Sequence, residues 1–372
     1  MAHGNNIRTD ATVRGRFARA ETAGPWEDGA SVPHTLRQRA SSFWNRHRAL
    51  IWILHSVWAL AVGTTIVLLA QDRYYLVLWV VLFLVVAWAF TLFLGRATID
   101  GDATGTRPPG LVHEVSSYVT RVVYQQTLFF LLPFYAYSTV VASANVMFLG
   151  LLGGLAVLSC IDLVFDRWLR TRPVFALAFF AVVAFAAINL LLPLLVGLPP
   201  RFSAPVAALL AVGGAAPLAL RTMRTRFHAR LWLVGVAVVI LVVPAGLPGV
   251  IPPVPLRMQQ ATFASSIDRR TLDMEHTFLD RVSAADVGDA LFVLVAVFAP
   301  TTLPATVQLE WWRGRELLRV SREIGITANA ASFRVWDAWR PQSGTVSPGQ
   351  YRVVLRTVER QVFGVVTLTV DE

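Results

Sequence analysis

Two stretches near the C-terminus carry the side chains best suited to recognition chemistry. EWWRGRE covers residues 310–316 and SFRVWDAWR covers residues 332–340, so four tryptophans and several arginines lie close together in the chain. A guanidinium group stacks favourably on an indole ring, and exposed Trp–Arg surfaces bind glycans, peptides and lipid headgroups. The same residue types also form the cores of small domains. At this point the residues could belong to a recognition surface or to a core.

Strand alternation separates these aromatic residues into two sets. Successive side chains of a strand point to opposite faces. Trp311 and Phe333 then fall on apolar faces and are core candidates, whereas Trp312, Arg334 and Trp336 fall on polar-looking faces. Those three either clamp a sheet edge by stacking, lie under a loop, or form a binding patch. They are the candidate surface patch.

Motifs of known catalytic chemistry are missing from the sequence. It has no GxSxG, GxxxxGK[ST], HExxH or strand-linked GxGxxG pattern, and Cys160 is its one cysteine. The segment DMEH places Asp273, Glu275 and His276 together, where a solvated turn is favoured over a divalent-metal site. We therefore predict no catalytic residues, no metal, no cofactor and no enzymatic activity.

The composition indicates an integral membrane protein. Hydrophobic residues make up 55% of the 372-residue chain and charged residues 15%, below the roughly one quarter of a typical soluble domain. Seven apolar runs approach the roughly 20 residues needed to cross a bilayer. We predict a seven-helix transmembrane domain over 49–251, with spans at Ala49–Ala70, Tyr75–Gly95, Val122–Ala142, Val146–Phe165, Pro173–Leu198, Phe202–Leu220 and Leu231–Ile251.

Polar residues inside those runs are a second set of candidates, because polar groups in a membrane are costly and are retained for function or for helix packing. Asp162 stands one helical turn before Asp166, which favours an interfacial charge network over a proton relay. Side-chain amides within membrane helices more often form hydrogen bonds between helices than bind solutes. The alternative for these residues is that they line a solute-binding cavity. The candidate membrane polar residues are His55, Gln125, Gln126, Asp162 and Asn189.

Arginine placement predicts the orientation. The segment 1–48 and the second, fourth and sixth loops hold eighteen arginines, and the other three loops hold two. The positive-inside rule then puts a disordered tail, residues 1–48, in the cytoplasm. Residues 252–372 have thirteen arginines and thirteen acidic residues, so the net charge of +10 lies elsewhere and indicates contact with anionic lipid, not nucleic acid.

Residues 252–372 change from long apolar runs to short alternating ones, which predicts a β-domain. The pattern fits an all-β antiparallel sandwich, immunoglobulin-like. With an odd number of predicted spans, this domain is expected on the side of the membrane opposite the N-terminus. The expected strands are Met258–Ser265, Leu291–Ala299, Ala305–Trp312, Glu316–Ile324, Ser332–Trp339, Gln350–Val358 and Gln361–Val370.

Two family resemblances accompany these patterns. A strand ending in WW, an RG turn, LLRV, SFRVWDAW, SPGQYRVVL and FGVVTLTV resemble the bacterial domain of unknown function 2914 over about 256–370. His55, Trp58 and the stretch YQQTLFFLLPFY, continuing to LSCID, resemble the multi-helix membrane domain of unknown function 5924. The resemblance implies a multi-pass protein of a bacterial inner membrane, which would put the β-domain in the periplasm, and it implies no known activity. Trp339 is an exception to the C-terminal resemblance, because a lysine or another polar residue is expected at its position.

The function predicted is a non-catalytic interaction or binding module carried by the β-domain. Its expected partners are the lipid bilayer and either an envelope protein or a cell-envelope polymer. The alternative is a transporter or flippase-like bundle, in which Gln125, Gln126, Asn189 and His55 line a hydrated cavity and the β-domain is an accessory.

Overall fold

The structure is a computed structural model of the 372-residue chain. It describes residues 110–161, 171–222, 248–299, 305–326 and 329–372, with isolated positions within 50–65, 165–168 and 227–238. The predicted tail 1–48 and the second apolar run lie outside the described residues, as does most of the first. His55, Asp162 and Asp166 also lie outside them.

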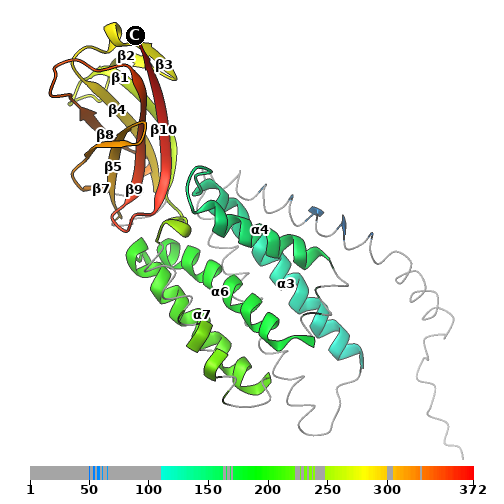
Figure 1. The fold of residues 1–372 in the computed structure, drawn as a ribbon. Helices are drawn as coiled ribbons and strands as arrows, with labels where there is room; N and C mark the ends of the chain where they lie inside the picture. The colour runs from blue at the N-terminus through cyan, green and yellow to red at the C-terminus, as the bar shows by residue number, and fades with distance from the viewer. Residues whose placement is uncertain are drawn as a thin grey trace, which may run out of the picture. The chain divides into compact units, whose positions relative to one another are not determined.

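Among the described residues, four long helices precede the β-region: α3 (Gly110–Tyr137), α4 (Val146–Cys160), α6 (Pro173–Val196) and α7 (Pro200–Thr222). α6 packs along α7, and α3 packs against α4 and α6 (Figure 1). α6 begins with a proline, whose missing N–H is tolerated in a first turn, and ends at Gly197, whose φ of 66° suits glycine. The shared core consists of apolar side chains including Leu128, Tyr135, Leu152, Val183, Leu190 and Ala211.

The predicted seven-helix transmembrane bundle is wrong. Over the described residues the chain forms six helices, including the 3-10 turn η1 (Pro248–Val250) and the four-residue α9 (Ala284–Val287). Of these six, one contains a stretch, Val174–Val196, that is long and apolar enough to cross a membrane. Its length and composition are those of a membrane span or of a buried core helix.

Helix length and composition explain the difference. α4 has 15 residues, which span about 22 Å at about 1.5 Å per residue and fall short of about 30 Å of hydrocarbon. α3 begins at Gly110 and so includes the polar segment HEVSS, which the predicted third span left out. α7 is rich in alanine and glycine and contains Pro205 and Pro217. Apolar composition alone overstated the number of spans.

The β-region forms two sheets. One has four strands in the order β2-β1-β4-β8: β2 (Met274–Phe278), β1 (Arg257–Ile267), β4 (Leu291–Ala299) and β8 (Asn329–Trp339). The other has six strands, with β3 (Arg281–Ser283), β10 (Val362–Asp371), β9 (Gly349–Thr357), β5 (Ala305–Arg313) and β6 (Glu316–Val320) in that order, and β7 (Ile324–Ile326) also paired with β5 (Figure 1).

The expected antiparallel, immunoglobulin-like arrangement is not the one observed. The described residues form ten strands in two sheets, and β3 pairs with β10 in parallel, so the second sheet is mixed. The additional strands β2, β3 and β7 have three to five residues each. Segments this short carry too little alternation to be found by periodicity. The seven longer strand predictions each coincide with observed strands to within a few residues, with Glu316–Ile324 divided between β6 and β7.

A single apolar core lies between the two sheets. Phe263 of the four-stranded sheet meets Trp311 of the six-stranded sheet edge-on, with ring centroids 6.1 Å apart. Trp339 and Tyr351 make a second ring contact between the sheets, in a tilted arrangement, with ring centroids 5.4 Å apart. Trp311 is fully buried, as predicted, and Phe333 is half-buried against the same core. Burial of these large rings on both sheets is what holds the two layers together.

Candidate functional site

The structure divides the candidate surface patch between the two sheets. Trp312 follows the inward-facing Trp311 in β5 and so points outward from the six-stranded sheet. Arg334 and Trp336 flank the buried Val335 in β8 and so point outward from the four-stranded sheet. The core separates the two sheets. The three residues therefore do not form one patch, and each sheet has its own aromatic site.

The site around Trp312 is a cluster of four side chains, Glu310, Trp312, Arg352 and Arg356, which we call the outer cluster. Arg352 lies directly opposite Trp312 across β5 and β9, and its guanidinium carbon stands 5.5 Å from the ring centroid. The Trp312 indole nitrogen donates to Oε2 of Glu310 at 3.2 Å. Oε1 of the same carboxylate forms an ion pair with Arg356. Both oxygens of Glu310 are therefore in use.

Trp336 has a simpler environment on the other outer face. It lies opposite Leu294 of β4, and the guanidinium of Arg269 stands 5.6 Å from its ring centroid. Arg334 is exposed two positions earlier on the same strand. This arrangement joins a turn to the sheet by cation–π stacking, one of the structural roles expected for these residues.

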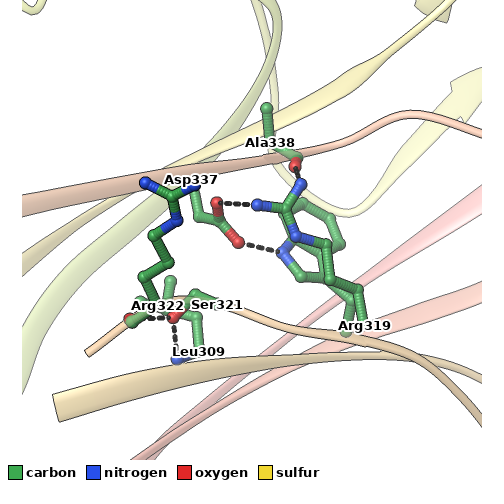
Figure 2. Close-up of polar contacts among 7 residues, drawn as sticks. Leu309, Arg319, Ser321, Arg322, Asp337 and Ala338 are labelled. Atoms are coloured by element: carbon green, nitrogen blue, oxygen red, sulfur yellow. Dashed lines mark hydrogen bonds and ion pairs between the residues drawn. The ribbon is translucent and has the colours of Figure 1, made fainter. Parts of the chain in front are cut away.

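Asp337 has a mostly buried, hydrogen-bonded carboxylate, and the sequence analysis did not identify it as a candidate site residue. It shares the inward face of β8 with Val335 and Trp339, and its side chain is only 12% exposed. The Trp311 indole donates to Oδ2 of the Asp337 carboxylate at 2.9 Å. Arg319 donates to Oδ1 at 3.3 Å (Figure 2). Arg319 also donates to the Ala338 carbonyl at 2.7 Å. Period-two alternation from Val335 could have identified Asp337 as inward-facing.

The contacts of Asp337 close an edge of the sandwich. Arg319 comes from β6 and Asp337 from β8, so their ion pair joins the two sheets where no backbone ladder does. Nearby, the Ser321 hydroxyl accepts from the Leu309 N–H and donates to the Arg322 carbonyl, both at 2.9 Å (Figure 2). A carboxylate held by two structural donors is occupied as a clamp and is poorly placed to act as a general base.

The turn before DMEH has an ordinary local structure. Oδ1 of Asp268 accepts from the Arg270 N–H at 2.8 Å, and this backbone hydrogen bond holds the pKa of the carboxyl below its usual value. Glu275 accepts from the Ser266 hydroxyl at 3.0 Å. Within the part of the chain that the structure describes, no three His, Cys, Asp or Glu side chains lie together as metal ligands.

The sequence profile of a Family of unknown function (DUF5924) matches residues 31–293, which is more than half of the chain. The chain belongs to this family. No curated protein matches the sequence. The match includes α3 to α7 and continues through β1, β2 and β3 into β4, so the family region ends inside a sheet. The membrane-domain resemblance is thereby confirmed, and it extends further toward the C-terminus than predicted.

In this DUF5924 member, two of the candidate membrane polar residues are buried in contacts between helices. Asn189 of α6 donates to the Tyr135 hydroxyl at 3.3 Å and accepts from the Ser203 hydroxyl at 2.9 Å. Gln125 of α3 donates to Sγ of Cys160 at 3.3 Å. Gln126 is half-buried on α3. Contacts of this kind join helices α3, α4, α6 and α7, which is the packing role that amides commonly take.

Proposed function

We propose that this DUF5924 protein is a membrane-associated protein whose β-region is a non-catalytic binding module. The observation that carries the proposal is the outer cluster: a tryptophan and two arginines, each half-buried, on the outer face of the six-stranded sheet and outside the closed core. Side chains that stabilise the domain, such as Trp311 and Asp337, point inward. Aromatic and arginine side chains outside a core are the residue types enriched where proteins bind partners.

Apolar side chains on the outsides of the helices support membrane association. Several large aliphatic residues of α4, α6 and α7 are exposed although their own helices pack together on the opposite side. Single exposed residues of this type are normal, but a set distributed over three neighbouring helices suits contact with lipid tails. The exposed set includes Met147, Leu151, Val157, Val174, Val196, Leu209 and Leu210.

The orientation belongs to the same proposal. The chain lies in a bacterial inner membrane with more than one crossing, its arginine-rich N-terminal segment is cytoplasmic, and its β-region is periplasmic. Eight arginines in residues 1–48 support the cytoplasmic N-terminus. The hydrophobic core between the two sheets, distinct from that of the helices, supports a separate C-terminal module. The partners are the bilayer and an envelope polymer or protein; nucleic acid is not among them.

Catalysis has less support than binding. The carboxylates of Glu310 and Asp337 are each held by an indole N–H and a guanidinium. Among the described residues, neither has a histidine, serine or cysteine partner that would serve as nucleophile or base. A binding role requires only that these contacts leave some side-chain surface accessible to a partner.

The test is capture from envelope fractions with the full chain in detergent. Photo-crosslinking side chains are introduced at position 317, beside Trp312 on β6, and at position 277, on β2 of the other sheet. We expect a saturable crosslinked product from position 317, and we expect Trp312→Ala to reduce it. Equal labelling from both positions, or no saturable product, would reject a binding role for this face.

A reporter fusion tests the orientation. A reporter that is active only outside the cytoplasm, fused after Glu372, is expected to be active. A cytoplasmic fluorescent reporter that is bright at the same position would reverse the orientation.

A further inference from the structure

The outer cluster contains a cation that lacks an anion. Glu310 uses Oε1 for Arg356 and Oε2 for the Trp312 indole. The neighbouring Arg313 pairs with Glu316 at 3.1 Å. Among the described residues, Arg352 forms no ion pair, and its Nε is buried without a hydrogen-bond partner. Its guanidinium is held instead on the face of Trp312, at 5.5 Å.

An arginine that is stacked on a ring but has no ion-pair partner is preorganised to bind an external anion. Stacking on the indole restrains the side chain, so less rotamer entropy is lost when a ligand binds. A planar guanidinium takes a carboxylate in a paired, two-bond geometry that a lysine does not reproduce. The charge that the cluster leaves uncompensated therefore selects a negatively charged group.

The surroundings of Arg352 indicate what the rest of that ligand carries. On its other side Arg352 lies opposite Thr367 of β10, whose side chain is exposed. Gln350, two positions earlier on β9, is also exposed and lies opposite Thr369. Hydroxyl and amide groups therefore stand beside the cation on an outward sheet face. Such groups hydrogen-bond to a ligand with hydroxyls of its own.

We propose that the outer face of β5, β9 and β10 binds an acidic polysaccharide, with Arg352 paired to a sugar carboxylate, Trp312 supporting the pair, and Thr367 and Gln350 contacting hydroxyls. This rests on the proposed binding function and names its ligand class. A lipid surface is the competing occupant, because the exposed Leu317 lies opposite Trp312 on β6. The polar neighbours on β9 and β10 favour the sugar polymer.

The experiment measures binding of polygalacturonate to the full chain in nanodiscs of zwitterionic lipid. Neutral dextran of matched length, inorganic phosphate and vesicles containing phosphatidylglycerol are the comparison ligands. We expect polygalacturonate binding that weakens with salt, and no binding of dextran. Arg352→Gln should weaken it by about tenfold or more, as loss of a hydrogen bond to a charged group implies. Arg334→Gln, on the other sheet, should change it less than about twofold.

A second variant separates ligand binding from folding. Thr367→Glu places a carboxylate opposite Arg352 at an exposed position, so it should neutralise the cation without disturbing the core. We expect it to weaken polygalacturonate binding as much as Arg352→Gln does, with an unchanged unfolding transition. Equal loss in Arg334→Gln, preferred binding of the lipid vesicles, or no polygalacturonate binding by the wild-type chain would each overturn the acidic-polysaccharide site. The crosslinking result at position 317 is independent of this ligand and decides the binding function separately.

Discussion

The indole nitrogen of Trp311 lies 2.9 Å from Oδ2 of Asp337, so a fully buried tryptophan of one sheet donates to a nearly buried carboxylate of the other. Buried indole N–H groups usually find a partner, and buried carboxylates require one. The two residues satisfy each other, and Arg319 supplies the compensating charge. EWWRG and VWDAW, which first suggested a binding motif, therefore contribute one residue each to an internal clamp.

The ion pair itself should be worth little. Arg319 and Asp337 are 45% and 12% exposed, so solvent screens the cation. A double-mutant cycle with Arg319→Gln and Asp337→Asn is expected to give a coupling of about 1 kcal/mol or less. Unfolding in urea, followed by pulse proteolysis of the full chain in detergent, measures it. A coupling of several kcal/mol would show that the pair is desolvated.

Trp311 should matter far more than Trp336. Trp311→Ala removes a fully buried ring and the donor to Asp337, and should cost about 3–5 kcal/mol of unfolding free energy. Trp336→Ala removes a half-exposed ring with a single stacked arginine, and should cost no more than about 1–2 kcal/mol. The same proteolysis assay compares them. Severe losses of equal size would place Trp336 in the structural core.

Gly364 should not tolerate a side chain. A Cβ at this position would stand 2.8 Å from Sδ and 2.9 Å from Cβ of Met258, where β10 approaches β1 of the other sheet. Gly364→Ala is expected to cost about 1–3 kcal/mol through overpacking. Gly325→Ala is the matched control, since nothing lies within 4 Å of its Cβ position. Thermal unfolding of both variants checks the difference; a silent Gly364→Ala would mean that the sheets can separate there.

Tyr351 should make the β-region sensitive to alkali. Burial raises the pKa of its hydroxyl above the ordinary value, and the hydroxyl donates to the Ser347 carbonyl at 2.8 Å. Because the folded state holds the proton more tightly than the unfolded state, this stabilisation is present below about pH 10 and is lost as pH rises above it. Tyr351→Phe should be less stable at neutral pH by about 1 kcal/mol and less sensitive to alkali. Parallel stability–pH profiles above pH 9 would contradict this.

The neighbours of Asn189 lead to a test of the transporter alternative. Asn189 is 3% exposed and uses its amide for Tyr135 and Ser203. A cysteine at this position, in a Cys160→Ser background, should resist a membrane-impermeant thiol reagent. Cysteine at the exposed Val141 is the positive control. Rapid labelling at position 189 would reveal the hydrated cavity that a transporter needs.

Local patterns of the β-region were readable from the sequence, because alternation records which face of a strand is buried. Trp311 and Val335 follow it, and so does Asp337, although a charged inward residue becomes intelligible only once Trp311 and Arg319 are seen beside it. The separation of Trp312 from Trp336 could not be read, because it depends on which sheet each strand joins. The sheet that a strand joins is determined by contacts between residues distant in sequence. Such contacts produce no periodic pattern in the sequence.

The predicted number of membrane spans was wrong for a different reason. Apolar content marks residues that avoid water, whether a lipid tail or another helix replaces it. α4 is apolar throughout yet has 15 residues, and α7 achieves close packing with small side chains such as Ala207 and Ala211. Counting apolar runs therefore recovered the positions of α4, α6 and α7 and misjudged which of them are both long and apolar enough to span.

The parallel pairing of β3 with β10 has a consequence for biosynthesis. Thr369, Val370 and Asp371 of the last strand hold Arg281, Val282 and Ser283 in the sheet, across about ninety residues of intervening chain. Because β10 is synthesised well after β3, β3 stays without this pairing partner until the ribosome has made residues 369–371. Deletion of residues 369–371 would therefore remove the pairing of β3, the first strand of the six-stranded sheet, as well as the end of β10.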